Sequence, residues 1–138
     1  MKNCATYCTN VLAVRTLPKG ESVSYGPLYT AESERRTAVV PVGFADGYPR
    51  ALSNRGYMLI RGQRAPVIGK VTCDYTILDV TDIPDVKAGD PVVIFGAQTF
   101  GGRNGHYYPG EAAADAGMST AEIMTLIHPR IPRICRTE

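Results

Sequence analysis

Short apolar runs alternate along the chain with clusters of glycine, proline, asparagine and aspartate, and this pattern predicts β-strands. Runs of four to eight apolar or β-branched residues between turn-forming residues are typical of strands. They occupy residues 11–15, 37–44, 57–61, 65–71, 76–80 and 91–95. The run at 37–44 is apolar almost throughout, which predicts a strand buried on both faces.

Turn residues separate these runs. Pro18 and Gly20 suit a tight turn after the first strand. The pair Gly62-Gln63 predicts a hairpin between 57–61 and 65–71. The glycine-rich segment 97–109 has no apolar periodicity, so we expect a loop there.

The pattern changes near the carboxyl end. Residues 111–116 are good helix formers and end at Gly117, a typical helix C-cap. Ser119 and Glu122 have the spacing of a capping box, which predicts a second helix ending before His128-Pro129. Residues 130–134 form an extended piece, which we expect at a sheet edge because proline cannot donate to a ladder.

Together these elements predict a mainly β fold in a single domain. Many short strands with frequent turns favour a small closed or partly closed β-barrel-like structure. One or two short helices should follow near the carboxyl terminus. The chain shows no internal repeat.

Composition narrows the function. The chain has 138 residues, 44% hydrophobic and 20% charged, which is ordinary for a globular domain. A net charge of +2 is too small to indicate nucleic-acid binding. No apolar run approaches the roughly 18 residues of a membrane span, and the first residues are too polar for a signal peptide. We therefore expect a soluble, cytoplasmic protein.

The cysteines do not indicate a metal site. Cys4 and Cys8 are spaced C-x3-C, whereas Cys73 and Cys135 stand alone, and the two histidines of the chain are far from the pair. A zinc site would need paired ligands at both ends. Reduced thiols and no metal are the expectation.

Taken alone, three residues could carry chemistry. Tyr25, before Gly26 in Ser24-Tyr25-Gly26, sits where a sharp turn could present its ring, although a neutral tyrosine is a poor base without a nearby cation. The alternative is a strand tyrosine packed on the core. Asp46 is a typical turn residue, and Arg50 could bind a carboxylate or be simply solvated.

Several segments occur together in one order and carry a family resemblance. They are Ser24-Tyr25-Gly26, Gly43-Phe44-Ala45-Asp46-Gly47-Tyr48-Pro49-Arg50, Leu52-Ser53-Asn54-Arg55-Gly56, residues 64–71, Asp79-Val80-Thr81 and residues 129–133. The chain resembles the carboxy-terminal β-domain of alanine racemases, enzymes that use pyridoxal phosphate (PLP). The resemblance covers residues 11–134, so we expect a domain of this type over 11–138, after a non-matching segment at 1–10.

The resemblance implies a composite active site. In that family the domain covers the mouth of a barrel from the other subunit of a dimer. The barrel holds PLP through a lysine, and the β-domain contributes a tyrosine as second acid/base, which falls on Tyr25. This chain has no counterpart of the barrel. PLP is therefore expected in the complete enzyme and not on this chain alone.

Other site residues follow from the same resemblance. The family binds the substrate carboxylate partly through a backbone N–H that falls on Cys73, and Phe44 replaces a tyrosine at the substrate entrance. The supporting polar network would include Asp46, Arg50, Lys70 and Asp74. Lys70 replaces an arginine and loses its bidentate geometry.

Two functional interpretations remain open. In the first, the chain is part of a racemase that interconverts L- and D-alanine for cell-wall precursors, either as a domain of a longer enzyme or as one that docks on a separately made PLP-binding barrel. Alone, it is expected to be inactive and to self-associate. In the second, it is a non-catalytic β-module kept for protein interaction. Phe44 and Ala121, which stand where the family has tyrosines, favour the second. Tyr25, Asp46, Arg50 and Asp74 favour the first.

Overall fold

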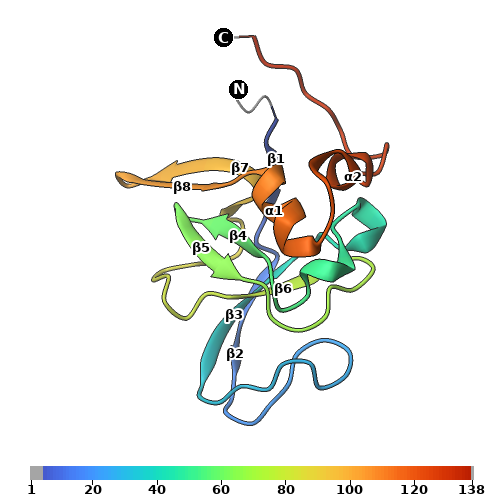
Figure 1. Cartoon of the computed structure of the whole chain (residues 1–138). Coiled ribbons are helices and arrows are strands. Elements are labelled where there is room, and N and C mark those ends of the chain that lie inside the picture. Colours follow the sequence, from blue (N-terminus) through green and yellow to red (C-terminus); the bar gives the residue numbers. More distant parts are fainter. Residues whose placement is uncertain (1–4, 138) are drawn as a thin grey trace.

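Two antiparallel sheets form the body of the protein in the computed structural model, which describes residues 5–137 (Figure 1). The larger sheet has the order β1-β7-β4-β5, with β8 paired to β7. The smaller sheet has the order β2-β3-β6. The mainly β class predicted from the strand pattern is confirmed.

The larger sheet contains β1 (Tyr7–Asn10), β4 (Tyr57–Ile60), β5 (Gln63–Pro66), β7 (Pro91–Phe100) and β8 (Arg103–Tyr107). β4 and β5 form the hairpin that the sequence predicts. Its turn residues are Arg61 and Gly62, with φ of 53° and 71°, one position earlier than expected. Two positive φ angles suit the twist of a two-residue hairpin turn.

The smaller sheet contains β2 (Ala13–Leu17), β3 (Arg35–Val40) and β6 (Thr76–Asp79). β3 pairs with β2 on one side and with β6 on the other. The prediction that the strand continues from 37 to 44 is wrong. Pro41 has no N–H for a ladder, and the chain turns into the 3-10 helix η1 (Phe44–Asp46), followed by η2 (Arg50–Leu52).

The segment 97–109 is not the predicted loop. β7 runs on to Phe100, and β8 pairs with its second half. Gly96 lies opposite Tyr107 at one end of this pairing, and Phe100 lies opposite Arg103 at the other. Gly101 and Gly102 form the turn, with φ of 53° and 82°. A Gly-Gly pair between two strands is a hairpin signal, but the polar residues of β8 concealed the strand.

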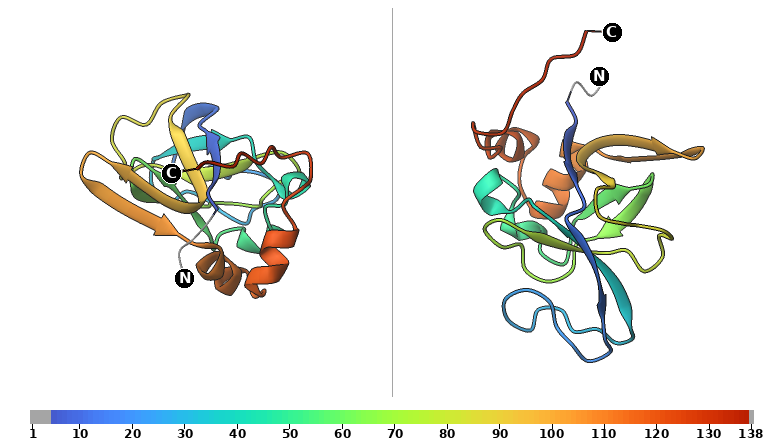
Figure 2. Two further views of the ribbon diagram at one scale, coloured as in Figure 1. Left: turned by 90° about the horizontal axis from the view of Figure 1, so that it is seen from above. Right: turned by 180° about the vertical axis from the view of Figure 1, so that it is seen from behind.

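Both predicted helices are present. α1 (Pro109–Ala116) ends at Gly117, whose φ is 70°. α2 (Thr120–Thr125) begins with the capping box, in which the amide of Glu122 donates to Ser119 Oγ at 3.2 Å. The helices pack on each other near the carboxyl end of the chain (Figures 1 and 2).

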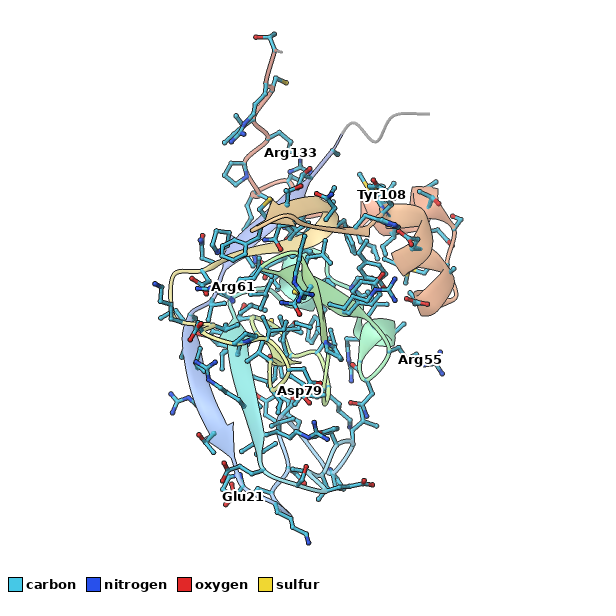
Figure 3. All side chains as sticks on the ribbon, turned by 90° about the vertical axis from the view of Figure 1, so that its left-hand side faces the viewer. Glu21, Arg55, Arg61, Asp79, Tyr108 and Arg133 are labelled. Atoms are coloured by element: carbon cyan, nitrogen blue, oxygen red, sulfur yellow. The ribbon has the colours of Figure 1, made fainter. Side chains whose placement is uncertain are left out.

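The segment after α2 is not an edge strand. Residues 130–134 pair with neither sheet. Instead, the guanidinium of Arg133 donates to the carbonyls of Ile127, His128 and Ile131, which folds the start of the tail on itself. Figure 3 shows Arg133 at the base of this tail, at the end of the molecule opposite to Glu21.

The core fills the space between the sheets and the helices. Its largest fully buried side chains are Tyr48, Tyr107, Phe95, Leu52, Met58, Leu59, Ile60, Leu78, Ile94 and Ile123. A closed barrel does not form, because the sheets are joined by one isolated bridge between Val67 and Leu78 and not by a continuous ladder. Residues 41–56 and 67–75, which leave the sheets, lie on the same side of the molecule as the loop between β2 and β3 (Figures 1 and 2).

Candidate functional site

Tyr25 lies on an exposed corner of the loop between β2 and β3. The base of the loop is closed by a bridge between Ser22 and Thr30. Ser24 and Gly26, on either side of the tyrosine, have φ of 62° and 71°. Tyr25 is 73% exposed, so the alternative of a core tyrosine is wrong. The left-handed residues turn the backbone sharply on both sides of the ring.

Lys70 contacts this corner. The Ser24 hydroxyl donates to the Lys70 carbonyl at 2.6 Å. The Lys70 Nζ lies 3.6 Å from the position that a Cβ on Gly26 would occupy. The structure thus brings Tyr25 and Lys70 together from segments 45 residues apart, with a positive charge beside the loop.

The Leu52-Ser53-Asn54-Arg55-Gly56 motif holds two loops in place. Asn54 Oδ1 accepts the amide of Gly69 at 2.6 Å, and its Nδ2 donates to the carbonyl of Leu28 at 2.8 Å. Ser53 Oγ accepts the amide of Val71 at 2.9 Å. The sequence pattern alone predicted no role for this motif. The signal available in the sequence was that these polar side chains fall in a turn and not in the apolar pattern of a core element.

Phe44, Arg50 and Cys73 form a second group on the same side. The amide of Phe44 donates to the carbonyl of Thr72 at 3.0 Å, and the amide of Ala45 donates to that of Cys73 at 3.0 Å. The Arg50 guanidinium lies 5.6 Å from the centre of the Phe44 ring, a cation–π contact. Phe44 is 44% exposed, so part of its side chain stays available for contact.

Residues 72–75 form a tight turn that presents Cys73. Thr72 Oγ1 donates to the Tyr75 carbonyl at 2.9 Å and accepts the Tyr75 amide at 3.2 Å. Cys73 and Asp74 are both exposed at its tip. Within residues 5–137 the Cys73 amide donates no hydrogen bond, so it is available to an outside acceptor.

Asp46 is more buried than the other predicted site residues. Its side chain is only 13% exposed. One carboxylate oxygen accepts the amide of Gly43 at 2.9 Å, and the other accepts a hydrogen bond from the Arg130 guanidinium. The structure therefore places Asp46 within the Phe44 turn and pairs it with Arg130, a residue that the sequence pattern did not indicate.

A hollow of about 370 Å³ adjoins Tyr25. Its lining consists of Leu12, Ala13, Arg15, Ser24, Tyr25, Val39, Thr72, Tyr75 and Ile77. Arg15, Thr72 and Tyr75 were not among the sequence predictions, because they lie in strands or turns without a distinctive pattern. A larger groove of about 470 Å³ lies between the two chain ends and includes none of the predicted site residues.

Three of the other tyrosines, Tyr7, Tyr48 and Tyr107, are unsuited to acid/base chemistry. Burial, followed by the charge of Asp46, raises the pKa of Tyr7 to about 12. Burial also raises the pKa of Tyr48 and Tyr107 far above the ordinary range. A general acid/base works best with a pKa near the operating pH.

No metal site or membrane helix is found in the described part of the chain. Residues 5–137 contain no cluster of His, Cys, Asp or Glu able to hold a metal. Cys8, Cys73 and Cys135 are free thiols, and Cys4 lies outside the described residues. None of the helices there has the length and apolarity needed to cross a membrane.

Comparison with known proteins gives one consistent family. The family model described as "Alanine racemase, C-terminal domain" matches residues 4–135, and so reaches further toward the amino terminus than the motifs above. An alanine racemase from Desulfosudis oleivorans is 44% identical over 135 residues, covering 97% of this chain and 33% of the relative. A broad specificity amino-acid racemase from Pseudomonas taetrolens is 47% identical over 97 residues, covering 70% of this chain and 24% of the relative.

The same likeness holds in three dimensions. The crystal structure of alanine racemase from Bartonella henselae with covalently bound pyridoxal phosphate superposes with a TM-score of 0.84 at 28% identity, covering 94% of this chain and 34% of that chain. This chain therefore spans about a third of the length of the relatives it matches.

Proposed function

The chain belongs to the alanine racemase family as its C-terminal domain, and on that premise we propose that it supplies one half of a PLP-dependent amino-acid racemase site. A barrel from a partner supplies the other half. The observation that carries the proposal is the exposed corner at Tyr25, beside Lys70. Alanine is the proposed substrate, and D-alanine for cell-wall precursors the proposed product.

The residues described do not by themselves fit a PLP site. A Schiff base needs a lysine within a pocket. The lysines among residues 5–137, Lys19, Lys70 and Lys87, are all exposed, and none of them lines either hollow. We assign to this chain the side of the site that faces the substrate, and to the partner the side that holds PLP. Bound there, PLP would withdraw electrons from the substrate α-carbon.

Tyr25 transfers a proton on one face of the substrate. Racemisation removes the α-proton from one face and returns a proton to the other, so it needs two groups on opposite sides. The phenol O–H of Tyr25 gives its proton to the α-carbon, and in the reverse direction the phenolate oxygen takes it back. Lys70 and Arg15 supply positive charge on this side, which stabilises a phenolate.

The loop at Cys73 binds the substrate carboxylate. Cys73 is an exposed residue whose amide has no acceptor within residues 5–137, so this amide can donate to a carboxylate oxygen. Phe44 forms an apolar wall next to it, with its ring held against Arg50. Because the donor is a backbone group, the cysteine side chain does not disturb this role.

Exposed apolar side chains on this side support a docked partner. Leu12, Tyr25 and Tyr75 are 53%, 73% and 47% exposed, and all three line the Tyr25 hollow. Apolar side chains gathered on one surface mark sites of interaction. We propose that the barrel covers them and that the isolated chain, lacking it, self-associates and is inactive.

A non-catalytic interaction module is the second candidate. Ala121, exposed in the first turn of α2, offers no hydroxyl to a phosphate, and Phe44 offers none to a substrate. Both candidates use the same docking surface. They differ in whether the Tyr25 hydroxyl takes part in a reaction.

Tyr25→Phe tests the proposal in the complete protein assembled with its barrel. The change removes one exposed hydroxyl, so folding and PLP absorbance should be unaffected. We expect the racemisation rate to fall about 10²–10⁴-fold, the usual contribution of a general acid/base. Exchange of the α-proton with solvent, followed from D- and L-alanine separately, should fail on one face only.

Tyr29→Phe, in the same loop, is the matched control and should leave the rate unchanged. The isolated chain with added PLP should not turn over alanine. An equal rate for Tyr25→Phe and wild type in both directions would contradict a catalytic role and favour the interaction module.

A further inference from the structure

Asp46 joins three parts of the chain. Its carboxylate accepts from the amide of Gly43 and from the guanidinium of Arg130. Its carbonyl accepts the amide of His128 at 3.1 Å and the hydroxyl of Tyr7 at 3.4 Å. The turn at η1 is thus tied both to β1 and to the segment that follows α2. The Asp46 side chain is largely buried, which strengthens its electrostatic contacts.

The same turn holds the Cys73 loop. Phe44 and Ala45 donate their amides to the carbonyls of Thr72 and Cys73. Gly43 packs so closely that a Cβ there would clash with those two carbonyl oxygens. Phe44 and the Cys73 loop therefore move as one unit, and a shift of the η1 turn displaces both.

Arg130 is well placed to fix that unit. Its backbone amide donates to His128 Nδ1 at 3.1 Å, so the residue is anchored at its own position in the tail. The hydrogen bond to Asp46 raises the pKa of the Arg130 guanidinium, and the negative charge of Asp74 adds to this effect. Arg130 is thus held by the carboxylate of the η1 turn, and that turn holds the Cys73 loop.

We propose that Arg130 is a positioning residue: through its ion pair with Asp46 it fixes the η1 turn, and with it the relative position of Phe44 and the Cys73 amide. The proposal rests on the function proposed above for its effect on substrate, but not for its effect on local order. The guanidinium is itself half exposed and carries no assigned chemical step. A purely stabilising arginine would change the stability of the whole fold without changing these loops selectively.

The test uses the complete protein assembled with its barrel, as Arg130→Ala and Arg130→Lys. Arg55→Ala is the matched control, because the Arg55 side chain makes no hydrogen bond or ion pair within residues 5–137 and points away from the body of the molecule (Figure 3). Amide hydrogen exchange is followed in peptides covering 43–47 and 72–75, with β7 as the internal reference.

Arg130→Ala should speed exchange in these two peptides at least tenfold and leave β7 unchanged. The Michaelis constant for alanine should rise about tenfold, with a smaller change in kcat. Arg130→Lys, which keeps the charge, should restore part of both effects. The double variant Asp46→Asn/Arg130→Ala should change the exchange rates and the Michaelis constant no more than the stronger of the two single variants, since both substitutions act on one contact.

Three results would overturn the proposal. One is unchanged exchange in both peptides. The second is faster exchange spread equally over β7, which indicates a general stabilising role. The third is faster local exchange with an unaltered Michaelis constant. If wild-type protein does not racemise alanine at all, the proposed function fails, while the exchange data still decide whether Arg130 positions the loops.

Discussion

The sheet core and the site loops are held together by different forces. In the sheet core (Tyr48, Ile60, Leu78, Ile94 and Phe95) every side chain is at most 1% exposed, and apolar burial dominates. In the site loops (residues 21–31, 43–47 and 69–75) the exposed residues include Tyr25, Phe44 and Cys73. There, hydrogen bonds from a few polar side chains to the backbone fix the positions.

The difference shows where each region is vulnerable. Burial is shared among many contacts, so losing one side chain from the core weakens the whole cooperative unit. A loop that depends on Asn54, Ser53 and Asp46 can lose its position when a single acceptor is removed, while the sheets stay folded. Three substitutions test this division, in order of decreasing effect.

Phe95→Ala should have the largest effect. Phe95 is 1% exposed and contacts the rings of Tyr7, Tyr48 and Tyr107. Removing a buried phenyl ring lowers the free energy of unfolding by about 3–5 kcal/mol. Urea denaturation measures the loss. Phe100→Ala, on the same strand but half exposed, is the control and should lose far less; equal losses would mean that burial does not dominate this sheet.

Asn54→Ala should have an intermediate effect, concentrated in the loops. The buried amide of Gly69 loses its acceptor, and Asn54 itself has a φ of 56°, which alanine tolerates poorly. Together these changes lower the free energy of unfolding by about 2 kcal/mol. Exchange of the Gly69 amide should rise more than that of β4.

Asn54→Asp keeps the acceptor for Gly69 and tolerates the same backbone conformation, so it should behave nearly as wild type at Gly69. If Asn54→Ala instead speeds exchange evenly across β4 and Gly69, the loops and the core form one unit, and the distinction between them is wrong.

Asp90→Asn should have the smallest effect and depends on pH. Burial alone would raise the pKa of Asp90, but hydrogen bonds from the Lys87 amide and Arg61 lower it overall. A lowered folded-state pKa stabilises the protein above the unfolded pKa of about 4, and this contribution is lost as pH falls through the folded value.

The asparagine variant should therefore be about 1 kcal/mol less stable than wild type at pH 6. The difference should shrink toward pH 3. Urea titrations at the two pH values measure it, with exposed Asp82→Asn as the control. A difference that is constant with pH would show that the charge of Asp90 does not stabilise the sheet region.

Local sequence signals predicted the fold better than the site. Hairpin β4–β5, the Gly117 cap and the Ser119 capping box depend on residues within a few positions of each other, and all three are present. The β7–β8 hairpin was missed because the polarity of residues 103–106 hid a strand whose partner supplies most of its hydrogen bonds.

The site was harder to predict because its contacts join distant segments. Cys73 could be named only through the family resemblance, and only that resemblance gave Tyr25 an acid/base role. The contacts of Asn54 with Gly69 and Leu28, and of Asp46 with Arg130, span 15 to 84 residues. Spacing along the chain carries no information about such pairs, so Arg130 could not be found from the sequence.

The corner at Ser24 has a consequence for the thermodynamics of association. A non-glycine residue in the left-handed region costs about 1–2 kcal/mol, and here the bond from Ser24 Oγ to Lys70 helps to offset it within the free domain. That backbone is therefore ordered before any partner arrives. When a partner docks, the Tyr25 ring is then immobilised, which costs about 0.5–1.5 kcal/mol in conformational entropy. The backbone of the loop does not have to be ordered as well.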